Sequence, residues 1–191
     1  GYGQDEILTA HLMNHAGGIA SQYHDLGYMI APNTSHTRPV IMMLARYSDV
    51  YLQETFGNDS DGTLFELEII QYMTHTVNAN PQSLKNPTYN PSWLGTDFGN
   101  MGDSNGKEDF RWNFQIKNKR ARDNYDNIMA TAKAFDLVGT ALDEALESVI
   151  DVDQWMRMYA MHSLVGQLDV YGVDTSPHNL WLYDHPGTGK I

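Results

Sequence analysis

Cysteine is absent from this 191-residue chain, so disulfides, zinc–thiolate sites and thiol nucleophiles are excluded. No apolar run approaches the roughly 20 residues of a membrane-spanning helix. The chain also does not begin with a basic segment followed by an apolar core, the pattern of a signal peptide. We therefore expect no membrane span, and export would depend on a targeting segment outside these residues.

Basic residues are scarce, because 12 Lys and Arg stand against 24 Asp and Glu and give a net charge of −12. Such a charge repels phosphate backbones, which argues against a nucleic-acid partner and favours cations or basic partners. What the chain does contain is 41% apolar residues, enough to build a sizeable core in a single domain over residues 1–191.

Five of the 12 basic residues fall in one stretch that contains no acidic residue: Arg111, Lys117, Lys119, Arg120 and Arg122. A solvated face is the ordinary explanation of such a stretch. A contact for phosphate or for an acidic substrate is the alternative.

The first third of the chain combines helical and strand-like patterns. Apolar residues at near-helical spacing predict a helix within residues 5–26 that ends or bends at Gly17-Gly18. The bulky apolar run at residues 40–47 predicts a buried strand, and residues 49–56 predict a short helix.

The middle of the chain is less regular. Residues 78–109 are rich in Asn, Pro, Gly, Ser and Asp, which predicts an irregular insertion whose aromatic residues, such as Phe98, pack down. An alternating strand is expected at residues 112–117. Asp123 is then expected to cap a helix that includes Ile128.

The clearest helix start is DVDQ, where Asp151 caps the backbone and Gln154 completes a capping box. The following apolar positions predict a wide core-facing surface: Val152, Trp155, Met156, Tyr159, Leu164 and Val165. These patterns together predict a mixed α+β domain with helices dominating its second half.

Two patterns point to metal binding only weakly. The segment GNDSDGTLFELE (57–68) places Asp59 and Asp61 at calcium-loop positions, but a glycine occupies the first position and a strand-like run at 63–70 follows. A plain turn is the favoured interpretation. His11 and His15 lie one helical turn apart, yet no third ligand is evident, so structural or surface histidines are the default.

The segment QLDVYGVDTSPHNLWLYD (167–184) places an aspartate and an asparagine at the two ends of a loop, Asp169 and Asn179. Phosphoryl transfer needs a carboxylate to orient the attacking hydroxyl and oxygen ligands to hold Mg²⁺. An aspartate ending a helix and an asparagine making a turn would give the same pattern, and physical reasoning alone favours this second explanation.

The segment IDVDQWMRMYAMHSLVGQLDVYGVDTSPHNLWLYDHPGTGK (150–190) resembles the spore coat protein H (CotH) kinase family. It is similar in its Asp-Val-Asp helix, its polar stretch ending in Asp, its His-Asn pair, its aromatic strand and its Gly-Lys turn. The segments ILTAHLMNHAGGIASQYHDLGYMIAP and VIMMLARYSDVYLQETFGNDSDGTLFEL resemble the earlier part of the family more loosely.

The resemblance implies a bacterial, secreted or spore-associated atypical protein kinase with a divergent kinase-like fold. Such an enzyme uses ATP and Mg²⁺ or another divalent cation to phosphorylate serine in Ser-rich protein segments. It implies Asp169 as the catalytic aspartate and Asn179 as the residue beside the metal. It further implies Lys117 as a phosphate contact and His178 as the residue that shapes the loop at the cofactor.

Three departures from the family pattern matter. The family's strands carry a glutamate where Arg46 stands and a lysine where Glu66 stands. The family's metal-binding Asp-x-Asp follows the Gly-Lys turn, so a sequence ending at Ile191 is expected to be truncated. A catalytically inactive module for binding, or for coat or cell-surface assembly, is therefore the alternative function.

Overall fold

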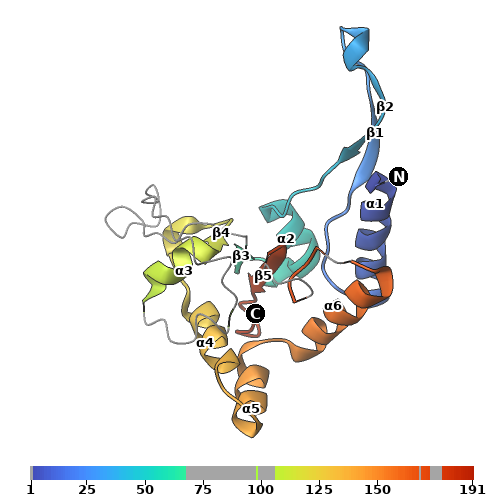
Figure 1. Cartoon of the computed structure of the whole chain (residues 1–191). Coiled ribbons are helices and arrows are strands. Elements are labelled where there is room, and N and C mark those ends of the chain that lie inside the picture. The colour runs from blue at the N-terminus through green and yellow to red at the C-terminus, as the bar shows by residue number, and fades with distance from the viewer. Residues whose placement is uncertain (1, 68–97, 99–105, 168, 173–177) are drawn as a thin grey trace, which may run out of the picture. The chain divides into compact units, whose positions relative to one another are not determined.

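The computed structural model describes residues 2–67, 98, 106–167, 169–172 and 178–191 (Figure 1). These residues form a mixed α+β structure with six α-helices and two small antiparallel sheets. Contacts divide the chain into two compact units, one comprising residues 1–57 and 153–166, the other residues 58–152 and 167–191. The expectation of one domain over residues 1–191 stays a prediction.

The first unit begins with helix α1 (Tyr2–Leu12), which continues into a π-helical turn (Met13–Gly17). Gly18 ends this turn in a left-handed conformation with φ 58°, and its N–H bonds to the Met13 carbonyl. A left-handed residue after a helix is the usual place for glycine, which has no Cβ to clash. The predicted end of the helix at Gly17-Gly18 is thereby confirmed.

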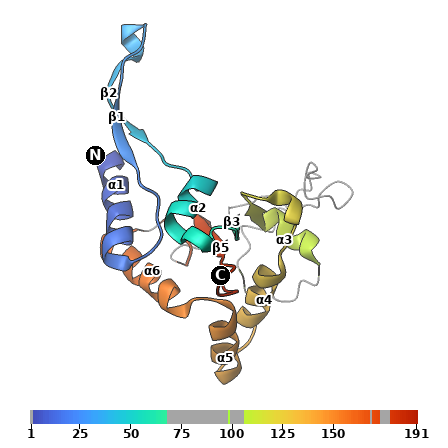
Figure 2. The same ribbon diagram turned by 180° about the vertical axis from the view of Figure 1, so that it is seen from behind.

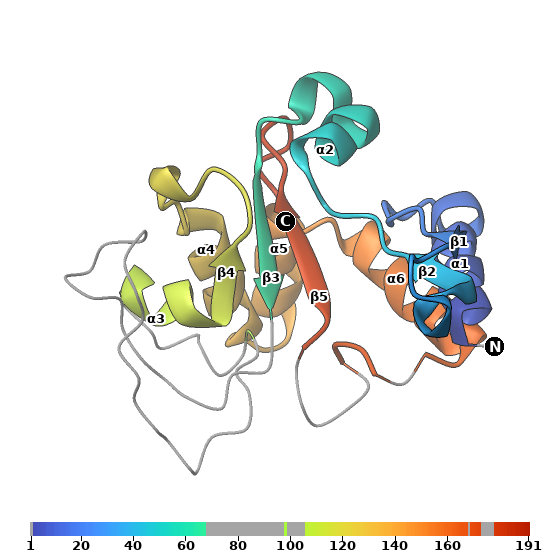
Figure 3. The same ribbon diagram turned by 90° about the horizontal axis from the view of Figure 1, so that it is seen from above.

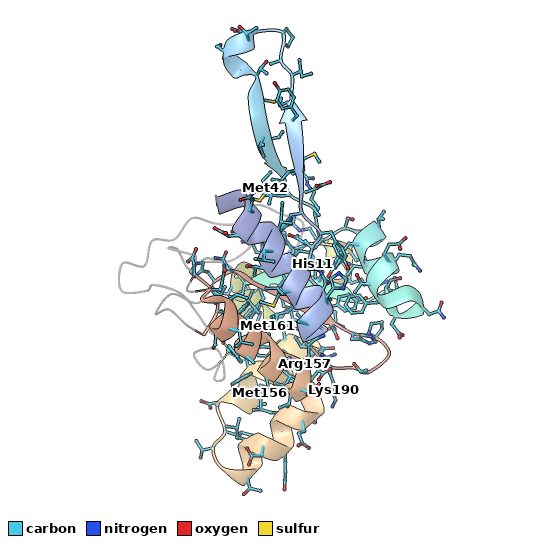
Figure 4. All side chains as sticks on the ribbon, turned by 90° about the vertical axis from the view of Figure 1, so that its right-hand side faces the viewer. His11, Met42, Met156, Arg157, Met161 and Lys190 are labelled. Carbon is cyan, nitrogen blue, oxygen red and sulfur yellow. The ribbon has the colours of Figure 1, made fainter. Side chains whose placement is uncertain are left out.

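Helix α6 (Val152–Val165) packs against this turn. A Cβ added to Gly17 would lie 2.9 Å from Met161 Cγ, so the glycine permits a close approach between the two elements. The Arg157 guanidinium donates to the Gly17 carbonyl at 2.8 Å. Figure 4 shows Arg157 and Met161 on α6 beside the helix that carries His11.

The predicted core face of α6 is only partly correct. Trp155 is buried, as are apolar residues in general when they face a core, and so is Met161, which the prediction did not include. Met156 and Leu164, however, are exposed.

A two-stranded antiparallel hairpin follows, formed by β1 (Asp25–Met29) and β2 (Arg38–Met43). It extends away from α1 in Figure 1. The expectation of a buried strand at residues 40–47 was wrong in two respects. The strand ends at Met43, and Val40 and Met43 are exposed, because β2 pairs only with β1 among the described strands. Helix α2 (Asp49–Phe56) agrees with its prediction and is capped by the Ser48 side chain.

The second unit is built on a three-stranded antiparallel sheet with the order β4–β3–β5 (Figure 3). Its strands are β3 (Thr63–Leu67), β4 (Phe114–Ile116) and β5 (Leu180–Asp184). Phe65 stands between Ile116 and Leu182, and Leu67 between Phe114 and Leu180. All six side chains are buried and form one face of the sheet. The opposite face carries Glu66, Gln115 and Trp181, as the alternation of strand side chains requires.

Three helices complete this unit: α3 (Lys107–Asn113), α4 (Asp126–Phe135) and α5 (Thr140–Val149). Helices α4 and α5 contact one another and follow in succession in Figure 2. The core includes Phe98, which stacks on Phe135 with ring centroids 5.5 Å apart. Phe98 therefore packs down as predicted, whereas most of the predicted insertion lies outside the described residues.

Two boundaries differ from the sequence prediction. Helix α3 begins inside the predicted irregular segment and runs to Asn113, so the strand expected at residues 112–117 is reduced to residues 114–116. Asp123 does not cap α4, because its backbone is left-handed with φ 47° and its carboxylate bonds to Arg111 instead. Tyr125 is the residue that immediately precedes α4.

No helix in the described part of the chain is both long and apolar enough to cross a bilayer.

Candidate functional site

The two ends of the loop singled out in the sequence meet in the second unit. The Asn179 carboxamide nitrogen donates to the backbone carbonyl of Asp169 at 2.8 Å. The preceding residue, His178, places its Nε2 2.6 Å from Asp169 Oδ1. The structure therefore brings together three of the four predicted site residues. Their assigned roles stay predictions.

Local backbone geometry explains how neighbouring residues reach the same aspartate. Asn179 has a left-handed backbone with φ 54°, a conformation that asparagine adopts more readily than most residues. It stands directly before β5, where regular alternation of side chains begins at Leu180. The left-handed residue interrupts the alternation that would send adjacent side chains to opposite sides.

Burial differs sharply between the two hydrogen-bonded side chains. The Asp169 side chain is 76% exposed, whereas that of His178 is 10% exposed. A buried imidazole thus holds one oxygen of a carboxylate that faces solvent. A carboxylate with an accessible oxygen can accept a proton from a bound hydroxyl or contribute to a cation site.

The donor set at this loop fits a magnesium ion only in part. Asp169 and the Asn179 carboxamide oxygen provide two oxygen donors, and Mg²⁺ is commonly bound through one or two protein carboxylates together with water and phosphate oxygens. Within the described residues, no three His, Asp or Glu side chains gather into a group that could hold a metal by themselves. This holds for His11 and His15 as well, whose ring centroids lie 4.2 Å apart.

The fourth predicted residue, Lys117, directly follows β4 in the three-stranded sheet. Its ammonium pairs with Glu66 on β3 and stands 5.4 Å from the ring centroid of Trp181 on β5. A cation over an indole face is stabilised by the ring quadrupole. Glu66, Lys117 and Trp181 therefore form one polar cluster on the sheet face opposite the apolar core, and Trp181 lies two residues after Asn179.

The remaining basic residues of the 111–122 stretch are mostly engaged within the protein. Arg111 pairs with Glu108 and with Asp123. Lys119 and Arg122 both pair with the exposed Asp61. Hydrogen bonds from these two cations hold the pKa of Asp61 below its usual value. With Lys117, four of the five residues contact carboxylates. A contact of this stretch with phosphate or with an acidic substrate stays a prediction.

The segment at 57–62 is a turn, as favoured from its sequence. The Tyr183 hydroxyl accepts from the Gly62 N–H at 2.8 Å and donates to the Asp59 carbonyl at 2.5 Å. A strand, β3, follows it, and not the second helix that a calcium loop requires.

Comparison with models of protein families identifies the family of the chain. The model of the family described as CotH kinase protein matches residues 40–191, which is more than half of the chain. The chain belongs to the CotH kinase protein family. No curated protein and no solved structure matches it, so the kinase-like fold stays a prediction.

Two features of the site were not predicted from the sequence. The contact between His178 and Asp169 joins residues nine positions apart, and adjacency to Asn179 alone gives no direction for the ring. The pairing of Glu66 with Lys117 spans 51 residues. Its only sequence signal is the presence of opposite charges in two strand-like segments, which does not specify register.

Proposed function

We propose that this member of the CotH kinase protein family transfers the γ-phosphate of ATP to serine in protein substrates, with a divalent cation such as Mg²⁺. The observation that carries the proposal is the arrangement of Asp169. Its carboxylate is exposed, its Oδ1 is bound by His178, and its backbone carbonyl is bound by Asn179. This is a fixed proton acceptor at the surface, as transfer to a hydroxyl requires.

In the proposed reaction, Asp169 Oδ2 accepts the proton of the substrate serine hydroxyl. The serine oxygen forms a bond to the γ-phosphorus, the bond between this phosphorus and the β,γ-bridging oxygen breaks, and its electron pair leaves with ADP. The carboxamide oxygen of Asn179 would be a donor to the cation. When bound, the cation neutralises charge on the phosphates.

The cluster of Glu66, Lys117 and Trp181 supports a role for Lys117 at the nucleotide. Lysine is absent at position 66, but the Lys117 ammonium reaches the same sheet face from the neighbouring strand and is oriented by Glu66. A lysine held by a glutamate is a recurring means of contacting nucleotide phosphates in kinases. A Lys–Glu pair is thus present on this sheet, formed by Lys117 beside β4 and Glu66 on β3.

The rival proposal is a module that keeps the fold for binding, or for assembly of a spore coat or cell surface, without phosphoryl transfer. Arg46 favours it, because this exposed residue stands where the resemblance to the family implies glutamate. Both proposals place the protein outside the cytoplasm or on the spore.

Phosphoryl transfer separates the two functions. The full-length protein containing residues 1–191 is incubated with radioactive ATP, Mg²⁺ and a Ser-rich protein substrate, and phosphoserine is measured. We expect transfer by the wild type and a loss of at least about 100-fold in Asp169→Asn, since removing a general base costs roughly that factor or more.

Asp143→Asn is the matched control, because Asp143 is an exposed aspartate on α5. This variant is expected to retain wild-type transfer. Wild-type protein that neither transfers phosphate nor shows an ATP- and Mg²⁺-dependent thermal shift would support the rival module.

A further inference from the structure

We propose that His178 is a positioning residue that fixes the catalytic carboxylate and leaves a single oxygen for the substrate proton. The inference rests on the proposed function of Asp169 as proton acceptor. It gives His178 a role at this carboxylate in place of its predicted role at the cofactor.

The first support is the contrast in burial. An exposed carboxylate side chain ordinarily exchanges between rotamers on a picosecond-to-nanosecond timescale. Here the Asp169 side chain is exposed, but Oδ1 lies 2.6 Å from the Nε2 of a buried imidazole. Because the buried ring is held by packing, it offers a donor at a fixed place, and the carboxylate orientation is fixed with it.

The second support is the bond made by the next residue. Asn179 donates from its carboxamide to the main-chain carbonyl of Asp169, while His178 binds the side chain. One dipeptide therefore fixes both parts of the aspartate. This requires adjacent side chains to reach the same residue, and the left-handed backbone of Asn179 (φ 54°) provides that geometry.

The chemical consequence concerns the two carboxylate oxygens. With Oδ1 occupied by the imidazole N–H, Oδ2 is the oxygen that accepts the hydroxyl proton during transfer. A carboxylate free to rotate would present either oxygen, at variable distance from the attacking hydroxyl. Loss of the His178 donor should therefore lower the rate of the chemical step and leave nucleotide binding unchanged.

Two amide substitutions test this geometry with matched chemistry. Gln in place of His178 extends far enough for its amide N–H to replace Nε2–H, whereas Asn is shorter and stops near the position of Nδ1. His178→Phe adds a variant that keeps an aromatic ring and has no donor. For each variant, kcat and the KM for ATP and for protein substrate are measured, together with the thermal melting temperature.

We expect His178→Phe and His178→Asn to lower kcat by about 10- to 100-fold without changing the KM for ATP, as is usual when a supporting hydrogen bond at a functional site is removed. His178→Gln should recover most of this loss. If the Phe variant does not fold, the comparison of Gln with Asn decides alone. Thr34→Ala, in the β1–β2 hairpin of the other unit, is the distant control and should keep the wild-type kcat.

Equal kcat values in the Gln and Asn variants would overturn the positioning role, as would a KM for ATP raised in all His178 variants. Both results leave Asp169-dependent transfer by the wild type intact, so they refute the inference without refuting the proposed function. Absence of Asp169-dependent transfer in the wild type would instead refute the proposed function, and the inference with it.

Discussion

The buried charge pair between Arg111 and Asp123 offers the most direct test of how the second unit is stabilised. Arg111 Nε donates to Asp123 Oδ1 at 2.8 Å, and its Nη2 binds the other oxygen of the same carboxylate. The two side chains are 6% and 11% exposed. Substituting Arg111→Met keeps the aliphatic stem but leaves the Asp123 carboxylate without its bidentate partner.

Breaking a buried pair by removing one member costs about 3–5 kcal/mol. The lower end applies here, because Lys107 still binds Asp123 Oδ2 at 2.6 Å and methionine retains part of the packing. We therefore expect Arg111→Met to lower the free energy of unfolding by about 3 kcal/mol. For a protein of this size the melting temperature should fall by about 6–12 °C.

Differential scanning calorimetry and urea unfolding followed by circular dichroism measure these quantities. Lys107→Met is the matched control: it removes a cation from the same carboxylate, but its side chain is 48% exposed, so less than about 1 kcal/mol should be lost. Asp123→Asn, which suits the left-handed backbone at this position, completes a double-mutant cycle with Arg111→Met. Equal destabilisation by Arg111→Met and Lys107→Met would refute the reasoning.

Two further predictions concern the same unit. Burial opposes ionisation of Asp123, but hydrogen bonds from Arg111 and Lys107 outweigh it and lower its pKa below 3.8. The pKa of Asp123 is lower in the folded state than in the unfolded state. The pair therefore stabilises the protein fully above the unfolded pKa, and this stabilisation is lost as the pH falls through the folded pKa. In urea titrations, wild-type stability should fall more steeply than that of Arg111→Met between about pH 5 and pH 2. Gly62→Ala should lower the free energy of unfolding by about 1–3 kcal/mol in the same assay, because a Cβ there would lie 2.2 Å from the Asp184 carbonyl oxygen. Gly106→Ala is the control and should change stability little, since a Cβ there would have no atom within 4 Å. Equal effects of the two glycine substitutions would contradict this account.

Local signals predicted local structure well. The helix at residues 49–56, the turn at 57–62 and the strand starting at Thr63 all follow from short-range patterns and agree with the structure. Helices α3 and α5 were not identified individually, because α3 lies at the end of a polar, irregular segment and neither helix begins with a side-chain cap.

The features that were not predicted correctly depend on partners that are distant in the sequence. Asp123 has the composition of a helix cap, yet Arg111 offers it a buried bidentate partner, and this interaction prevails over capping. Likewise, the basic stretch contains no acid in its own sequence, but Asp61 and Glu66 reach it across the fold. Partners separated by more than 50 residues depend on strand register, which hydrophobic patterning alone does not provide.

At the candidate site, the loop between Asp169 and Asn179 was predicted from residue types and family resemblance, and the structure brings its two ends together. The sequence gives no indication of the His178 contact, because the direction of that ring depends on the left-handed backbone at Asn179. Asparagine tolerates this conformation without requiring it, so the residue type alone does not predict it.

The hydroxyl of Tyr183, near the end of β5, influences the position of the Asp169–Asn179 loop, which precedes the start of the strand. By bonding to both sides of the 57–62 turn, it anchors β5 to the segment that leads into β3. Sliding β5 by a single residue would break both bonds and turn Trp181 toward the apolar interior. The Tyr183 hydroxyl thus fixes the register of β5, and with it the position of the Asp169–Asn179 loop along the strand relative to the Glu66–Lys117 pair. A tyrosine outside the candidate site therefore helps to determine how that loop is aligned.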